Sequence, residues 1–164
     1  MKYLMDANIF IGSKNTFYKF NVCPGFWEWL SKTTVVASID SVKYELFDGK
    51  DDLSEWVKNH LSDSFFIEQD IDIQKSYQEV VTYIQGLEQY EQPAKNDFFN
   101  VADGWLIAAA RVLDCDIITH ETFDPHIKRK IKIPNIASHY HINCLRIYDV
   151  LEKENVKFVF HTDT

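Results

Sequence analysis

Cysteine, proline and glycine are scarce in this sequence of 164 residues, which contains 3, 4 and 5 of them. The cysteines Cys23, Cys115 and Cys144 lie far apart and form no Cys-x-x-Cys pair. This spacing excludes a disulfide scaffold and favours a reducing compartment. Glycine and proline are scattered, and no linker, repeat or low-complexity tract divides the chain. We therefore expect one domain over residues 1–164.

Long apolar runs are also missing, and none approaches the length of a membrane-spanning helix. The apolar opening over residues 3–5 is interrupted at once by Asp6, which argues against a signal peptide. We expect a cytoplasmic protein that makes no use of a membrane.

Positive charge is in short supply. The chain has 17 Lys and Arg against 25 Asp and Glu, a net charge of −8. A protein that coats nucleic acid without specificity needs the opposite sign, so any nucleic-acid function must depend on a local site. Hydrophobic residues make up 46% of the chain, which excludes disorder and is enough for a core.

Short apolar segments alternate with helical patterns along the chain. Strands are predicted at residues 3–5, 34–37, 65–67, 116–119 and 143–146. Helices are predicted from Pro24, after a cap at Ser38 or Asp40, and over about 51–61, 71–90, 101–113 and 147–154, with Pro93 as a break. This alternation predicts an α/β fold with a parallel sheet covered by helices on both faces.

Four acidic residues lie near the ends of the predicted strands. Asp6 follows the first strand directly, and Glu121 lies two residues after the Thr119 that ends a later strand. Asp103 opens the helix before that later strand, and Glu45 lies in the helix after the second strand. Ligand sites of parallel sheets form beyond the carboxyl ends of the strands, so we expect these acids to converge there.

Each acid taken alone has a simpler explanation. Asp103 fits a helix N-terminus, Asp6 fits a turn, and the two glutamates fit a solvated surface. Taken together, converging carboxylates repel each other, and their pKa values rise unless a cation neutralises them. Mg²⁺ or Mn²⁺ is the natural occupant because these hard ions prefer oxygen ligands.

Four segments of the chain resemble the signature blocks of PIN-domain ribonucleases, in the order found in that family. They are residues 3–10, Val42-x-x-Glu45-Leu46, Ala102-Asp103-x-x-Leu106 and residues 117–121. The set is similar to VapC-type toxins and to related prokaryotic proteins, and it extends from residue 1 to about 154.

The resemblance implies a three-layer α/β/α sandwich and an endoribonuclease that hydrolyses RNA with Mg²⁺ or Mn²⁺. It implies that Asp6, Glu45, Asp103 and Glu121 are the metal ligands and catalytic acids. In this reading Asn8 and Thr119 support the ligand carboxylates through hydrogen bonds. An antitoxin protein that restrains the enzyme and a homodimer are the partners that the family implies.

The fourth acid departs from the family pattern, in which an Asp usually follows the strand in a Thr-x-Asp or Thr-x-Asn arrangement. Glu121 occupies that position here, and Asp124 three residues later is a competing ligand. Asp124 precedes Pro125, as a turn residue often does, so Glu121 is the predicted ligand. The region between Glu45 and Asp103 is also long for a minimal toxin.

A basic run follows the fourth acid, and its residues Lys128, Arg129 and Lys130 are predicted to contact the phosphate backbone of RNA. Its alternative is a solvated loop. A zinc site at His139, His141 and Cys144 lacks a fourth ligand.

Two other functions compete with a nuclease. One is a phosphohydrolase that uses Asp6 as its nucleophile, although the residues after Asn8 do not fit that class. The other is a non-catalytic module that keeps the fold and binds a partner protein.

Overall fold

The computed structural model describes residues 1–159 and contains one five-stranded sheet in which all neighbouring strands are parallel. The strand order is β3-β2-β1-β4-β5. The strands are β1 (Tyr3–Met5), β2 (Val36–Ile39), β3 (Phe66–Ile67), β4 (Asp116–Ile118) and β5 (Cys144–Leu145). The residues of β1 and β2 are all buried, as expected for a parallel sheet covered on both faces.

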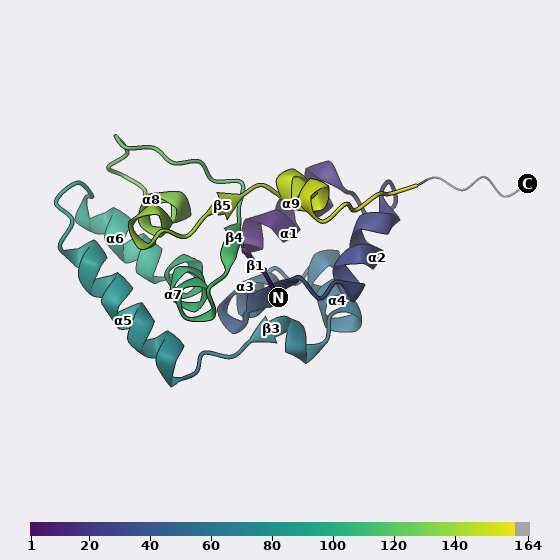
Figure 1. The fold of residues 1–164 in the computed structure, drawn as a ribbon, viewed down its shortest axis with the longest axis horizontal. Helices are drawn as coiled ribbons and strands as arrows, with labels where there is room; N and C mark the ends of the chain where they lie inside the picture. Colours follow the sequence, from purple (N-terminus) through teal and green to yellow (C-terminus); the bar gives the residue numbers. More distant parts are fainter. Residues whose placement is uncertain (160–164) are drawn as a thin grey trace, which may run out of the picture.

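Nine α-helices of the described residues surround this sheet. They are α1 (Ala7–Gly12), α2 (Pro24–Lys32), α3 (Asp40–Asp48), α4 (Asp52–His60), α5 (Ile71–Gln85), α6 (Gln92–Phe99), α7 (Asp103–Leu113), α8 (Ile133–Ala137) and α9 (Ile147–Lys153). Figure 1 shows α5 to α8 on one side of the sheet and α1, α2, α4 and α9 on the other, and α3 contacts α1 and α4. The predicted α/β/α sandwich is confirmed.

Within residues 1–159, no helix combines the length and the apolar character needed to cross a bilayer.

The second strand begins later than predicted. Tyr3 of β1 pairs with Val36, so β2 extends to Ile39 and contains Ser38. The Ser38 hydroxyl donates a 2.6 Å hydrogen bond to the Met5 carbonyl oxygen, so this side chain bonds to the neighbouring strand β1. Ser38 is therefore no helix cap, and α3 begins directly at Asp40.

The long helix α5 ends earlier than the predicted Tyr90. It stops at Gln85, and the chain turns before α6, which begins at Gln92 and has Pro93 in its first turn. Proline suits the first turn of a helix because its missing N–H would be unpaired there anyway, so Pro93 begins a helix as well as ending a pattern. The Lys95 ammonium of α6 donates to the Gln85 carbonyl oxygen at 2.9 Å and so caps α5.

Besides α6, two shorter helices have no predicted counterpart. Helix α1 has six residues and α8 has five, which is too short for a helical periodicity to show in the sequence. Asp6 caps α1 by accepting a hydrogen bond from the Asn8 amide, and α1 continues into a π-helical turn over Ser13–Phe17. The first of these helices fixes the direction in which the chain leaves β1.

Helix α7 lies against the sheet and packs along α5. The two helices approach closely at Gly104, where an added Cβ atom would lie 2.9 Å from Cε2 of Tyr77 and 3.3 Å from Cε1 of Phe98. The Tyr77 ring in turn stacks on Trp105, with ring centroids 3.7 Å apart. This contact fixes the position of the first turn of α7.

Candidate active site at the switch in strand order

Strand β1 has β2 on one side and β4 on the other, so the direction of strand succession reverses at β1. A cleft of about 690 Å³ opens there. Its lining includes all four predicted acids, which are Asp6, Glu45, Asp103 and Glu121. Asp6 follows β1 and Glu121 follows β4, so the carboxyl ends of two adjacent strands bring them together.

Asp6 is the most deeply buried of the four, with 2% of its surface exposed. Its carboxylate accepts hydrogen bonds from Thr119 Oγ1 at 3.0 Å and from the Asn8 backbone amide at 3.4 Å. Burial raises the pKa of Asp6 to about 6, although these hydrogen bonds oppose the shift. Thr119 thus holds the Asp6 carboxylate through its side chain, and Asn8 does so through its backbone amide.

Asp103 is the first residue of α7 and is half-buried. Burial raises the pKa of its carboxyl to about 8, with smaller contributions from the negative charges of Asp6, Glu121 and Glu45. Among residues 1–159 no hydrogen-bond donor reaches this carboxyl. Asp103 is therefore the acid of the cleft that the protein itself stabilises least in the charged form.

Glu45 lies at the rim of the cleft, and its Oε1 atom accepts a 2.7 Å hydrogen bond from the backbone amide of Ala102. Desolvation raises the pKa of Glu45, and the bond from Ala102 opposes that shift. Since Ala102 precedes α7, the Glu45 side chain joins α3 to the start of the helix that carries Asp103.

Both carboxylate oxygens of Glu121 have partners. Oε1 forms an ion pair with the Lys130 ammonium at 2.6 Å, and Oε2 accepts a 2.8 Å hydrogen bond from the Ile133 amide. The ion pair raises the pKa of Lys130, with smaller contributions from Asp103 and Asp6. Lys130 is therefore a counter-ion that the chain supplies to its own cleft.

Asp124 lies outside the cleft lining. Its Oδ1 atom accepts a 3.0 Å hydrogen bond from the His126 amide, and its own amide donates to Asn135 Oδ1 at 3.1 Å. These contacts are typical of an aspartate that shapes a turn. The structure thus places Glu121, and not Asp124, with the other three acids.

Of the basic run, Arg129 and Lys130 line the cleft. Lys128 does not, and its backbone carbonyl is engaged by the Glu91 amide at 3.1 Å. The structure therefore brings Arg129 and Lys130, but not Lys128, to the cleft lining, and the predicted contact of Lys128 with RNA stays a prediction. The remaining two cations face six acids in the lining, which leaves the cleft acidic.

Two of those six acids were missed from the sequence. Asp48 follows Glu45 by three residues on α3, so helical spacing alone would place it on the same face. Asp97 lies on α6, and with that helix unpredicted nothing in the sequence pointed to it. Both are exposed at the outer part of the cleft.

In residues 1–159 no group of three or more His, Cys, Asp or Glu side chains is gathered closely enough to hold a metal ion. Some carboxylates of the cleft interact with protein groups instead, as in the ion pair between Glu121 and Lys130. The residues His139, His141 and Cys144 form no such group either, and the His139 ring stacks on Tyr83 with ring centroids 3.7 Å apart.

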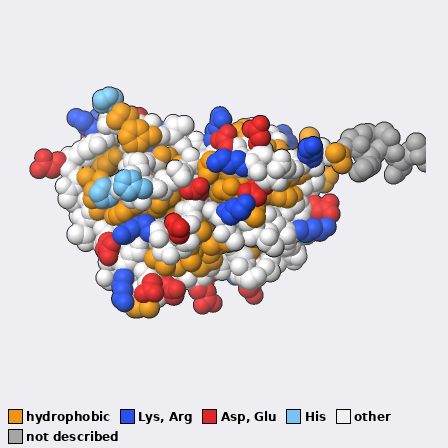
Figure 2. Space-filling view, in the orientation of Figure 1, with side chains coloured by type: hydrophobic (Ala, Val, Ile, Leu, Met, Phe, Trp, Pro, Cys, Tyr) orange, Lys and Arg blue, Asp and Glu red, His pale blue; other side chains and the backbone are white. Residues whose placement is uncertain are grey.

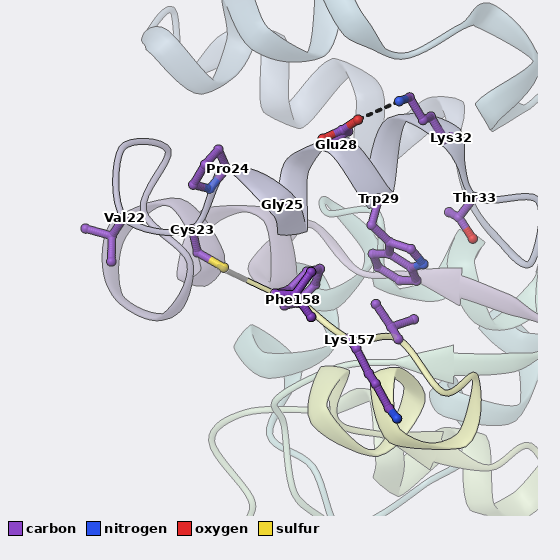
Figure 3. A pocket seen from close by; sticks show the side chains of 12 residues that line it. Val22, Cys23, Pro24, Gly25, Glu28, Trp29, Lys32, Thr33, Lys157 and Phe158 are labelled. Atoms are coloured by element: carbon purple, nitrogen blue, oxygen red, sulfur yellow. Dashed lines mark hydrogen bonds and ion pairs between the residues drawn. The ribbon is translucent and has the colours of Figure 1, made fainter. Parts of the chain in front are cut away.

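A second hollow of about 710 Å³ lies between α2 and residues 156–159 (Figure 3). Phe158 packs over Gly25, and the hollow's Glu28 and Lys32 pair with each other at 2.6 Å on the exposed side of α2. The lining has no cluster of carboxylates among the described residues. The acid cleft is therefore the place where this fold gathers groups capable of chemistry.

A family model described as Domain of unknown function (DUF4411) matches residues 3–158 of the chain. No curated protein and no solved structure matches it.

Proposed function

We propose that this chain, which belongs to the DUF4411 family, is a PIN-like endoribonuclease that hydrolyses RNA phosphodiester bonds with Mg²⁺ or Mn²⁺. One observation carries the proposal. Four acids that are far apart in the sequence, between residues 6 and 121, line a single cleft at the reversal of strand order. Parallel sheets bind their ligands at this position.

The donor set of the cleft fits a hard divalent cation. Its acids offer carboxylate oxygens, and no cysteine or histidine of residues 1–159 lines it. Asp103 lacks a hydrogen-bond donor among the described residues, and the positive charge of Lys130 offsets only a small part of the burial and repulsion that disfavour its ionised form. Asp6, Glu45, Asp103 and Glu121 are the residues that would hold the ion.

When bound, Mg²⁺ or Mn²⁺ would polarise a phosphoryl oxygen as a Lewis acid and lower the pKa of water, so that hydroxide becomes available as the nucleophile for phosphorus. The chain prepares for this by orienting its own groups. Thr119 fixes the Asp6 carboxylate, and the Ala102 amide fixes Glu45. Because Asp103 has a pKa of about 8, it holds a proton at neutral pH, and loading the cleft releases that proton.

Arg129 and Lys130 provide the local positive charge that RNA requires. Both line the cleft. The Arg129 side chain is 88% exposed, and its ion pair with Glu91 Oε1 is long, at 3.7 Å, so a phosphate can compete for the guanidinium. The alternative in which Asp6 is a nucleophile fits less well, because its carboxylate is buried and bonded to Thr119.

The test is a Mn²⁺ titration followed by calorimetry, together with cleavage of an end-labelled, mixed-sequence RNA. We expect the wild type to bind Mn²⁺ and cleave, and Asp103→Asn to lose both. Asp114→Asn is the matched control, because it changes an exposed aspartate at the other end of α7 in a left-handed conformation that asparagine tolerates. A wild type that neither binds Mn²⁺ nor cleaves RNA would refute the proposal.

A further inference from the structure

A large exposed side chain stands close to the acid cleft. Phe123 lies two residues after Glu121, and 56% of its surface is exposed. Two residues of extended chain span at most about 7 Å, so Phe123 is a near neighbour of the cleft. Two hollows of about 420 and 310 Å³ have Phe123 and Ser138 in common, so the ring forms part of the wall between them.

The smaller hollow is rich in flat side chains. Tyr83 and His139 stack with their ring centroids 3.7 Å apart and their planes within 8°. Tyr90 also lines this hollow. Figure 2 shows histidine side chains among hydrophobic ones at this end of the molecule. Such a surface offers π-faces to a planar ligand.

The segment after Phe123 is held in place by side chains from other elements. Gln89 Nε2 donates to the carbonyl oxygens of Pro125 and Ile127, at 3.1 and 2.9 Å. Asn135 Nδ2 donates to the Asp124 carbonyl oxygen at 2.7 Å. The exposed ring is thus presented from a fixed loop, which lowers the entropy lost when a ligand binds.

The charge of the same loop indicates which planar ligand fits. Arg129 and Lys130 follow within seven residues and reach the cleft, so an aromatic surface and phosphate-binding groups occur together. An unpaired base of single-stranded RNA carries both complements, a planar ring and a phosphate. An apolar peptide would satisfy only the first.

We propose that Phe123 and the adjoining hollow bind an unpaired nucleobase of RNA, next to the phosphate that lies in the cleft. This inference rests on the proposed nuclease function and assigns it single-stranded RNA as its substrate. Phe123 acts as a positioning residue that holds the strand, and it takes no part in the reaction at phosphorus.

The test measures binding of a short unstructured RNA that carries 2-aminopurine, in Ca²⁺, by the fluorescence of the base. A second RNA with the same backbone has abasic sites. We expect Phe123→Ala to weaken binding of the first RNA by at least about fivefold, the lower end of what loss of one stacked base gives. Binding of the abasic RNA should not change, and Phe123→Trp should keep the affinity for both.

Phe158→Ala is the control, since it removes an exposed phenylalanine that lines neither the acid cleft nor the two hollows beside Phe123. If Phe123→Ala binds and cleaves RNA like the wild type, the nucleobase site is wrong and the nuclease stands. If the wild type cleaves no RNA and binds neither RNA, both proposals are wrong. If Phe123→Ala weakens both RNAs equally, the ring supports the loop and stacks on no base.

Discussion

The carboxylate of Glu45 accepts a 2.7 Å hydrogen bond from the backbone amide of Ala102, 57 residues further along the chain. One acid of the cleft therefore has two tasks, as a charge facing the other acids and as the group that anchors the start of α7. The two tasks can be separated by substitution. A side chain with an acceptor oxygen at position 45 can keep the hydrogen bond, whereas only a carboxylate carries the negative charge.

Glu45→Gln should keep the bond to Ala102 and lose the charge, whereas Glu45→Ala should lose both. Removing a side chain that caps a helix N-terminus costs about 1 kcal/mol. We therefore expect thermal denaturation in EDTA to show a Tm lower by about 2–4 °C for Glu45→Ala and little changed for Glu45→Gln. Both variants should cleave RNA at least about tenfold more slowly. Equal stability of the two variants would show that the bond to Ala102 contributes nothing.

The metal-free protein should become less stable as the pH rises from about 4 to about 8. In this range folded Asp103, with a pKa of about 8, keeps a proton that the same carboxyl has lost in the unfolded chain, where the ordinary value is 3.8. Unfolding then releases a proton, so a higher pH favours the unfolded state. Asp6, with a pKa raised to about 6, adds to this trend at the lower pH values.

Asp103→Asn removes the larger part of this dependence. One pKa unit corresponds to about 1.4 kcal/mol, so we expect the variant to gain at least about that much stability at pH 8 in EDTA. Melting curves at pH 5 and pH 8 would show the gain, with Asp114→Asn as the control. A variant less stable than the wild type at pH 8 would mean that Asp103 acts mainly as a structural charge at the helix start.

Glu121 and Asp124 should differ sharply in their effect on cleavage. Glu121→Gln removes a carboxylate from the cleft and weakens the ion pair with Lys130. We expect single-turnover cleavage at saturating Mn²⁺ to slow by at least about tenfold, or about 1.4 kcal/mol. Asp124→Asn changes a turn outside the cleft and should have much less effect. A slow Asp124 variant beside a normal Glu121 variant would reverse the assignment of the fourth acid.

Gly104→Ala should destabilise the fold next to Asp103. The added methyl group would lie 2.9 Å from the Tyr77 ring, which is itself stacked on Trp105 and has little room to move. Overpacking of this kind costs about 1–3 kcal/mol, more than the gain of up to about 1 kcal/mol in helix propensity. Denaturant unfolding should therefore show a net loss. Gly86→Ala, with no contact under 3.5 Å, should be close to neutral.

The sequence was most informative where an apolar run ends in an acid. Three buried residues followed by Asp6, and Ile117 and Ile118 followed closely by Glu121, were enough to place both acids at the carboxyl ends of strands. Helix α6 was not predicted, because Pro93 in its first turn also interrupts the helical pattern that precedes it. Asp97 lies on α6 and was therefore missed as well. The ion pair between Glu121 and Lys130 depends on the conformation of the loop that joins these two residues, and a hydrophobic pattern in the sequence carries no information about that conformation.

The central position of β1 has a consequence for how the chain matures during translation. Its neighbours β2 and β4 are made later, and β4 is complete only at residue 118. A nascent chain can build the half-sheet β1-β2-β3 first, but one edge of β1 then stays unpaired until the 51 residues from 68 to 118 have been made. Glu121 is made after β4, so the acid cleft takes shape only late in synthesis. A ribosome-bound fragment that ends before β4 would therefore lack both Glu121 and the strand that positions it, and would contain no complete acid cleft.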